Sequence, residues 1–141
     1  MEPTDQRVRR SMNEQTITFC VNGPPKPKDR PRFSGHAYTT KKTREYEQVV
    51  RVAAMSAMTM WRNQNAGKHW NAAGPFGITV FFFMGDKRKR DLDNCLKSVT
   101  DALNKLLYND DSQLDEICAM RDYDVRSPRA VVTVRRLREG E

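Results

Sequence analysis

The chain has 141 residues, of which 38% are hydrophobic and 30% charged, values that are ordinary for one globular domain whose core needs no disulfides or structural metal. No apolar run is long enough to cross a membrane, and we expect neither secretion nor twin-arginine export because no apolar stretch follows the early arginines. The net charge of +7 and isoelectric point near 9.6 favour an acidic partner. Nucleic acid fits better than a membrane surface, since the cations do not line an amphipathic helix, although a solvated cationic surface is the alternative.

The chain starts with a polar segment and a strand. Residues 1–14 are polar and charged, and we expect a flexible N-terminal arm there, followed by a single domain over residues 15–141. Thr16 to Val21 alternates with a period of two, which predicts a strand that Asn22-Gly23-Pro24-Pro25 ends.

A basic segment lies between residues 26 and 42. Pro31 disfavours a helix, so we expect a long functional loop. Phe33 and Tyr38 lie among the cations, and their rings fit stacking on exposed bases near a branch point as well as packing in the core. The candidates for contacts with nucleic-acid phosphates are Lys26, Lys28, Arg30, Arg32, Lys41 and Lys42.

The middle of the chain predicts a helix and then a strand. Apolar residues recur at helical spacing from Thr43 to about Trp61, which indicates a helix packed on the core. Residues 63–75 are rich in Gly, Asn and Ala and predict a loop, whereas the β-branched and aromatic run Ile78 to Met84 predicts a buried strand. Gly85 to Arg90 is a short charged connection. Its cations are further candidates for phosphate contacts: Lys87, Arg88, Lys89 and Arg90.

Residues 92 to about 107 predict an amphipathic helix, because apolar residues recur at i, i+3, i+4 and i+7. Its polar face carries Asp93 and Lys97, whereas a helical Asp91 would point about 200° away from Asp93. Two carboxylates that share one ion therefore require Asp91 to lie just before the helix in extended conformation. The alternatives are a plain N-cap for Asp91 and an ordinary surface ion pair between Asp93 and Lys97.

A second acidic group follows the helix at Asn109-Asp110-Asp111-Ser112, four turn-forming residues that would return the chain toward the sheet. Leu114 to Asp122 and Ala130 to Arg136 predict two strands joined as a hairpin across residues 126–129. The predicted order β-α-β-α-β-β gives an α/β (α+β) fold, a mixed sheet of about four strands with helices packed on it.

The two acidic groups together predict a chemistry. If three or four of these carboxylates meet, repulsion raises their pKa values by about one to three units unless a cation neutralises them. A hard cation on oxygen ligands beside basic residues is the minimum equipment for metal-assisted phosphodiester hydrolysis.

The cysteines and histidines do not predict a metal site. Cys20, Cys95 and Cys118 are odd in number, show no Cys-x-x-Cys spacing and lie in apolar surroundings, so we expect reduced, buried thiols of an intracellular protein. His36 and His69 lie far apart in the sequence and are expected in surface loops.

Several motifs with fixed spacings carry a family resemblance. They are Asp91-x-Asp93-Asn94-x-x-Lys97-x-x-x-Asp101-x-Leu103, then Asp110-Asp111-x-Gln113, preceded by Lys26-x-Lys28-x-Arg30-Pro31-Arg32-Phe33. With these motifs the chain resembles the RusA family of Holliday-junction endodeoxyribonucleases over about residues 16–136. The agreement of several spacings in order is much more specific than a lone Asp-x-Asp.

The resemblance implies roles for individual residues. Asp91, Asp93 and Asp111 would be metal-binding catalytic carboxylates, Asp110 a neighbouring acid of the metal site, and Lys97 the essential catalytic lysine. A small variation in helix-to-turn spacing leaves open whether Asp110 or Asp111 is the direct ligand.

The resemblance also implies a function. We expect a Mg²⁺-dependent, structure-selective endodeoxyribonuclease that resolves Holliday junctions by paired symmetric nicks in DNA recombination and repair, with Mn²⁺ as a possible substitute. Its expected partners are four-way junction DNA and a second copy of the chain in a homodimer, with no membrane. A cytoplasmic protein encoded by a bacterium or phage follows from the same resemblance.

Two other classes of function compete with this one. A catalytically inactive branched-DNA-binding protein would use the basic surface without the acids, and metal-dependent nicking of a branched substrate separates it from a nuclease. An Asp-x-Asp phosphatase of the haloacid-dehalogenase kind would place its first Asp directly at the end of an apolar strand, followed by larger cap and core segments. Here residues 85–90 intervene and the chain is short.

Overall fold

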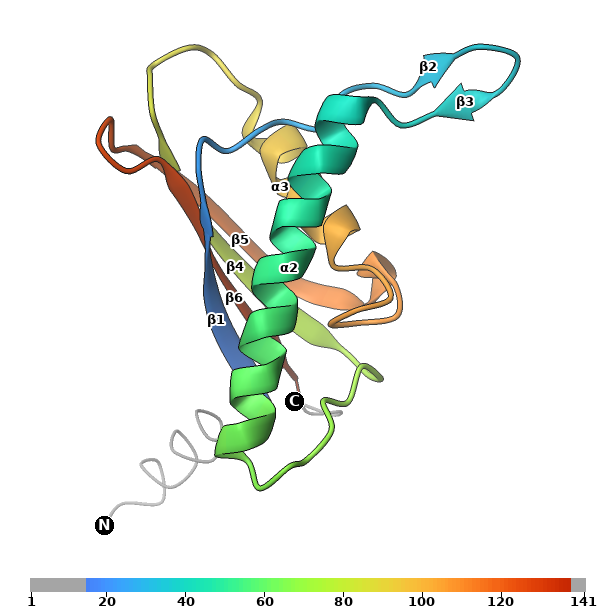
Figure 1. The fold of residues 1–141 in the computed structure, drawn as a ribbon, viewed down its shortest axis with the longest axis vertical. Coiled ribbons are helices and arrows are strands. Elements are labelled where there is room, and N and C mark those ends of the chain that lie inside the picture. The colour runs from blue at the N-terminus through green and yellow to red at the C-terminus, as the bar shows by residue number, and fades with distance from the viewer. Residues whose placement is uncertain (1–14, 138–141) are drawn as a thin grey trace.

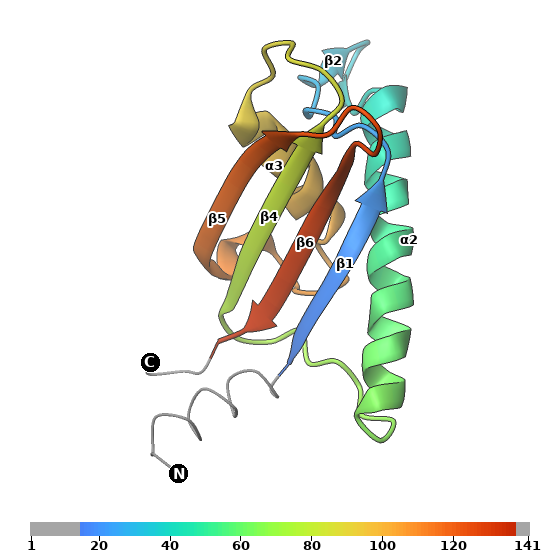
Figure 2. The same cartoon turned by 90° about the vertical axis from the view of Figure 1, so that its left-hand side faces the viewer.

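A four-stranded mixed sheet with two helices packed on one of its faces forms the body of the protein (Figures 1 and 2). The structure is a computed structural model and describes residues 15–137, so the predicted arm at residues 1–14 lies outside the described residues. The elements are β1 (Thr16–Asn22), β2 (Arg32–Phe33), β3 (Ala37–Tyr38), α2 (Lys41–Gln64), β4 (Phe76–Met84), α3 (Leu92–Ala102), the 3₁₀ turn η1 (Asp111–Gln113), β5 (Leu114–Tyr123) and β6 (Arg129–Arg136). The predicted fold class and order of the major elements are confirmed.

The strand order in the sheet is β1-β6-β4-β5, and only the β4–β5 pair is parallel. The predicted hairpin between the last two strands is therefore wrong, because β4 lies between β5 and β6. The physical reason is burial: β6 buries Ala130, Val132 and Val134 in the centre of the sheet, whereas β5 is mostly exposed and takes the edge. The connection from β5 to β6 passes the end of β4, where Asp124 N donates to Met84 O at 2.8 Å.

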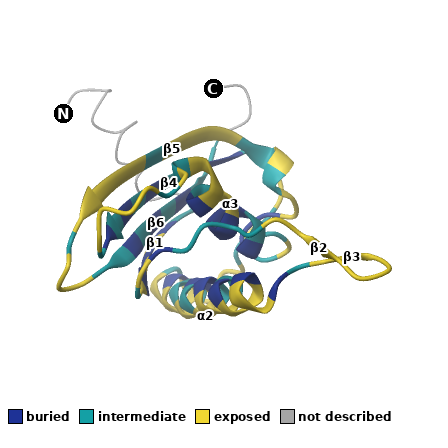
Figure 3. Ribbon diagram, turned by 90° about the horizontal axis from the view of Figure 1, so that it is seen from above, coloured by how far each residue is buried: buried dark blue, intermediate teal, exposed yellow. Residues whose placement is uncertain are grey.

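The core lies between the sheet and the two helices (Figure 3). Alternate residues of β4 are buried, among them Ile78, Val80 and Phe82, as the apolar run predicted. No described helix covers the other face of the sheet, which Figure 2 turns toward the reader. Cys20 and Cys118 lie exposed on β1 and β5, so their predicted burial is wrong.

Cys95 is buried in α3 as expected, and its burial raises the pKa of the thiol to about 11. All three cysteines are free. Among residues 15–137, no helix is both long and apolar enough to cross a membrane.

The two helices differ from their predicted lengths. Helix α2 begins at Lys41, two residues before the predicted start at Thr43, and the side chain of its N-cap Thr40 accepts a hydrogen bond from Thr43 N. Helix α3 ends at Ala102, about five residues early, because the chain turns through Lys105 at φ 60°. Leu103, Leu107 and Tyr108 still reach the core from this turn, which explains why the apolar spacing imitated a longer helix.

Candidate active site

The start of α3 presents two carboxylates. Asp91 is the N-cap in extended conformation (φ −71°, ψ 118°), and its Oδ1 accepts a hydrogen bond from Asp93 N at 3.1 Å. The predicted extended placement is confirmed, and it coexists with the simple capping role. Asp93 is exposed in the first turn, and its carboxylate forms no hydrogen bond or ion pair within residues 15–137. The alternative of an Asp93–Lys97 ion pair is therefore not what the structure contains.

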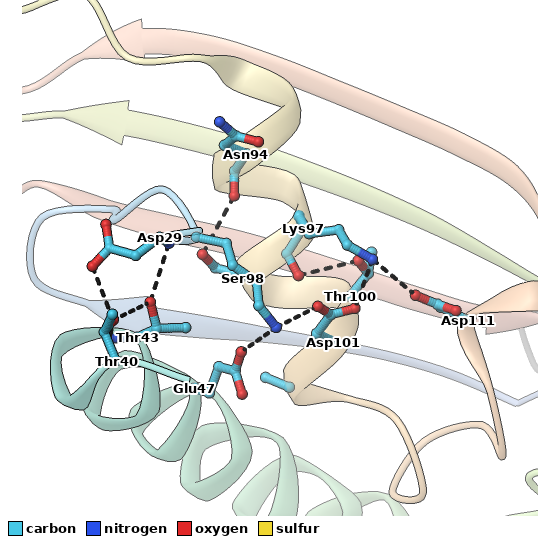
Figure 4. A network of polar contacts seen from close by, with 12 residues as sticks. Asp29, Thr40, Thr43, Glu47, Asn94, Lys97, Ser98, Thr100, Asp101 and Asp111 are labelled. Atoms are coloured by element: carbon cyan, nitrogen blue, oxygen red, sulfur yellow. Dashed lines mark hydrogen bonds and ion pairs between the residues drawn. The ribbon is translucent and has the colours of Figure 1, made fainter. Parts of the chain in front are cut away.

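Lys97 contacts acids from two segments of the chain. Its Nζ lies 3.2 Å from Asp101 Oδ1 and 3.9 Å from Asp111 Oδ2 (Figure 4). Asp93, Lys97 and Asp101 are spaced by four along one face of α3, so Asp111 approaches the same helix face that carries Asp93. The second acidic group thus returns to the side of α3 that the sequence assigned to the site.

Asp101 is shared between two lysines. Lys28 Nζ lies 2.5 Å from Asp101 Oδ2 and 3.0 Å from Glu47 Oε1 on α2. The Lys28 side chain is only 21% exposed, and its ammonium is engaged inside the protein. Glu47 was not among the residues singled out in the sequence. These contacts make a chain of charges, Glu47–Lys28–Asp101–Lys97–Asp111, which we call the ion-pair chain.

The basic segment is tied to α3 by backbone contacts as well. Lys28 N donates to Asn94 O at 2.9 Å, and Ser98 Oγ donates to Lys26 O at 2.8 Å. Both bonds lie within the first two turns of α3, so the segment passes directly beside the helix that carries the acids. This proximity follows from hydrogen bonds between residues about seventy positions apart, and no local pattern signalled it.

The ion-pair chain sets the pKa values of its acids in opposite directions. Burial opposes ionisation of Asp101, but Lys28 and then Lys97 outweigh it, so the pKa of Asp101 lies below its ordinary value. Burial raises the pKa of Asp111, and its hydrogen-bonded neighbour Asp101 raises it further despite the opposing charge of Lys97. Burial and Asp101 therefore disfavour the ionised form of Asp111 by more than Lys97 favours it.

The turn at η1 gives the two adjacent acids different tasks. Asp110 Oδ2 caps the turn by accepting from Ser112 N at 3.0 Å, and the pKa of Asp110 is lowered by its hydrogen bonds from Ser112. Gln113 completes the capping box through Asp110 N, and its amide donates to Ala72 O and Gly74 O. The turn is thereby fixed to the loop before β4, with Asp111 directed at Lys97.

A family model described as Endodeoxyribonuclease RusA matches residues 22–135. The chain belongs to this family. A search of the curated proteins found no match. The matched range contains the basic segment and both acidic groups, so this RusA-family chain is an endodeoxyribonuclease by membership, in agreement with the predicted enzyme class.

The remaining basic residues of the RusA-family chain differ in their exposure and in their contacts. Arg90 Nη1 lies 2.7 Å from Asp86 Oδ1, and this ion pair lowers the pKa of Asp86 to about 2. The backbone carbonyl of Arg90 accepts a hydrogen bond from Arg121 Nη1. Lys87 lies over the Tyr123 ring at 5.5 Å. The cations whose side chains lie mostly in solvent are Arg30, Arg32, Lys41, Lys42, Lys87, Arg88 and Lys89, whereas Lys26 is half-buried.

The acids fit a hard divalent cation in the chemistry of their donors. Carboxylate oxygens are the ligands that Mg²⁺ prefers, Asp93 has no partner within residues 15–137, and the raised pKa of Asp111 marks a place where added positive charge is favourable. In the described part of the chain, however, no three His, Cys, Asp or Glu side chains converge closely enough to hold a metal ion. The structure thus brings Asp111 to Lys97 but does not assemble the predicted ligand set in one cluster.

The ion-pair chain predicts a pH-dependent stability. The lowered pKa of Asp101 means that its contribution is complete above the ordinary carboxyl value of 3.8 and is lost as the pH falls below it. The raised pKa of Lys28 means that its contribution is complete below 10.5 and is lost as the pH rises beyond it. We expect Lys28→Met to lower the free energy of unfolding by about 1–3 kcal/mol at pH 7, measured by urea denaturation.

The matched control is Lys42→Met on the exposed side of α2, which should change stability by no more than about 0.5 kcal/mol. The difference between wild type and Lys28→Met should shrink in acid, since protonated Asp101 no longer attracts Lys28. A Lys28→Met variant as stable as wild type at pH 7 would show that the ion-pair chain does not hold the fold together.

Proposed function

We propose that the protein is a Mg²⁺-dependent, structure-selective endodeoxyribonuclease that resolves four-way Holliday junctions by paired symmetric nicks in recombination and repair. The observation that carries the proposal is the approach of Asp111 to Lys97 on the helix face that also bears Asp93. Membership of the RusA family supports the junction as substrate. The basic surface beside the acids supports a polyanion as the ligand.

In this proposal Asp91, Asp93 and Asp111 hold Mg²⁺, or Mn²⁺ in its place. When bound, such an ion binds a phosphate oxygen, favours hydroxide formation from water and stabilises the leaving oxygen. Asp111 is the better candidate for the direct ligand, because its carboxylate approaches Lys97 on the helix face that carries Asp93, and no such approach is found for Asp110 within residues 15–137. Asp91 keeps one carboxylate oxygen free of its capping bond.

Lys97 acts on the reacting phosphate. Its side chain is 57% exposed while its ammonium is anchored by Asp101, so it can meet a phosphate oxygen without leaving the site. A compact ammonium there stabilises charge that develops on the phosphate in the transition state, or orients the attacking water. Lys28 has a different role from the other cations: it is a positioning residue that neutralises Asp101 on the side away from Lys97.

Removal of one acid from the site tests the catalytic assignment. Asp91→Asn or Asp93→Asn should lower the rate of junction cleavage in Mg²⁺ by at least about a hundredfold, because the amide is a poor ligand for the cation. Junction affinity should stay the same or increase, since a negative charge is removed from a phosphate site. Gel assays on a labelled synthetic four-way junction, with nicks mapped on every strand, measure both quantities.

Asp115→Asn is the matched control, because Asp115 is exposed on β5 and forms no ion pair within residues 15–137. It should cleave as wild type does. Junction binding without any metal-dependent nicking by wild type would instead favour the inactive branched-DNA-binding protein.

The exposed cations predict a steep dependence of DNA binding on salt. Each phosphate contact contributes about 0.9 to the slope of log affinity against log salt, so a slope of several units is expected. Lys42→Ala should reduce that slope by about one, whereas Lys28→Met should leave it unchanged because its ammonium is held by Asp101 and Glu47. Fluorescence anisotropy at several salt concentrations measures the slope, and a nearly flat line for wild type would remove the basic segment from the interface.

Paired nicks on a junction with approximate two-fold symmetry need two equivalent active sites, so we propose a C2 homodimer. Light scattering at the concentration used for cleavage should give twice the mass of the 16.3 kDa chain. A monomeric mass together with normal paired nicking would contradict the dimer.

A further inference from the structure

Residues 30–39 form a small arm that projects from the body of the protein. The arm contains the hairpin β2–β3, which extends beyond the end of α2 in Figures 1 and 3. Phe33 is 79% exposed on this hairpin. A ring this exposed is not part of the core, so one of the two alternatives that the sequence left open is removed. The ring of Phe33 at the end of the arm is therefore accessible to a binding partner.

The arm leaves from a fixed base. Asp29 N donates to Thr43 Oγ1 at 3.1 Å, and Thr40 Oγ1 donates to Asp29 Oδ2 at 3.0 Å. Thr40 and Thr43 are buried, and the preceding Lys28 is bonded to α3. Figure 4 shows these hydrogen bonds next to the ion-pair chain. The start and the end of the arm are therefore both anchored beside the candidate active site, although its tip is free.

The length of the arm suits a contact a short distance from the scissile phosphate. An extended chain advances about 3.3 Å per residue, so the hairpin tip can reach on the order of 15 Å from its base. The tip itself turns through Gly35 at φ 75°, with Ser34 N donating to His36 O at 3.2 Å. On a DNA substrate bound at the candidate active site, this reach would correspond to nucleotides close to the scissile phosphate.

The two faces of the hairpin differ. Arg32 pairs with Tyr38 and Phe33 pairs with Ala37, so the two aromatic side chains project from opposite faces. Tyr38 is engaged by His36 in an edge contact with ring centroids 6.4 Å apart. Phe33 shares its face with the small Ala37, which leaves its ring open to a flat partner.

The charge of the arm identifies the partner as nucleic acid. Arg30 and Arg32 precede Phe33 closely, and residues 30–39 contain no acidic side chain. Cations would hold the phosphates while the ring stacks on a base, a combination typical of proteins that bind unpaired nucleotides. In an intact duplex every base already has neighbours above and below, so only a base that is splayed at a branch offers a free face.

We propose that Phe33 recognises the branch point by stacking on an unstacked nucleobase, and that it thereby separates four-way junctions from plain duplex. This inference rests on the proposed function, because it names the feature of the substrate that the nuclease reads. A phenyl ring has no hydrogen-bonding group, so the contact selects for DNA shape and not for base identity.

The experiment compares Phe33→Leu and Phe33→Trp with wild type, on a four-way junction and on plain duplex, without divalent metal. Leucine keeps the apolar bulk but removes the aromatic face. Phe33→Leu should weaken junction binding about tenfold and leave duplex binding within about twofold, whereas Phe33→Trp should retain junction preference. The fluorescence of 2-aminopurine placed at the branch should change on binding of wild type and Phe33→Trp, and not with Phe33→Leu.

Two control variants distinguish the loss of stacking from other causes of weaker binding. One removes a positive charge, and the other shortens an exposed apolar side chain elsewhere. Arg32→Ala should weaken junction and duplex binding alike and reduce the salt slope by about one, whereas Phe33→Leu should keep the wild-type slope. Val125→Ala alters another apolar side chain, 78% exposed in the loop between β5 and β6, and should change neither affinity.

An unchanged ratio of junction to duplex affinity in Phe33→Leu overturns the inference, as does an equal loss on both substrates. A change in mass by light scattering would show that Phe33 packs against a second copy of the chain, which also overturns it. If wild type itself does not prefer junctions, the proposed function fails together with this inference. If wild type prefers them and Phe33→Leu is unaffected, only the role of Phe33 fails.

Discussion

The attraction of Asp101 for two lysines is the interaction on which the arrangement of the site depends. One of its oxygens binds Lys28 and the other binds Lys97, so a single carboxylate connects the basic segment to Lys97 on α3. Glu47 extends the contact to α2, and Asp111 extends it to the turn before β5. Four segments of the chain are therefore held together by charges, of which Lys28, Glu47 and Asp101 are partly buried and would be unfavourable without their partners. Loss of Lys28 would leave Glu47 without an ion pair and Asp101 with Lys97 alone.

Local pattern was sufficient for most of the architecture, because burial in a two-layer fold imposes a period of two on strands and 3.6 on helices. Prediction from local pattern failed where two different arrangements of the chain give the same spacing of apolar residues. The apolar spacing continued through Leu103 and Leu107 although the helix had ended, since a tight turn returned these residues to the same core. The last two strands were assigned to a hairpin because short connections usually join neighbours, but the more apolar β6 occupies the centre of the sheet and β5 the parallel edge. Cys20 and Cys118 lie in strands whose second face has no covering helix among the described residues, which alternation alone does not reveal.

Some features of the candidate site could likewise be predicted from the sequence, whereas others could not. The extended N-cap at Asp91 followed from the geometry of two carboxylates near one helix, and the position of Asp111 on the face of Lys97 followed from the family motif. The choice of partners within the site did not follow from the motif. Lys97 is four residues from both Asp93 and Asp101, and spacing treats these pairs alike. Asp101 forms the ion pair because it is partly buried and already carries Lys28, which fixes its ionised state, whereas Asp93 is exposed to water in the first turn.

This choice of partners matters for the chemistry. Because Lys97 is drawn toward Asp101, the carboxylate of Asp93 is left without a cation of its own inside the described protein, and Asp111 receives only a distant one. Two acids near one helix face thus keep negative charge that the fold does not neutralise, while the cations of the arm and of residues 87–89 remain outside on the surface. Such a separation is unfavourable for the isolated chain and favourable for a complex in which a cation meets the acids and a phosphate backbone meets the basic surface. Under the proposed function, a metal would neutralise the acids and a DNA backbone would neutralise the basic surface, so that neither ligand alone would neutralise both halves.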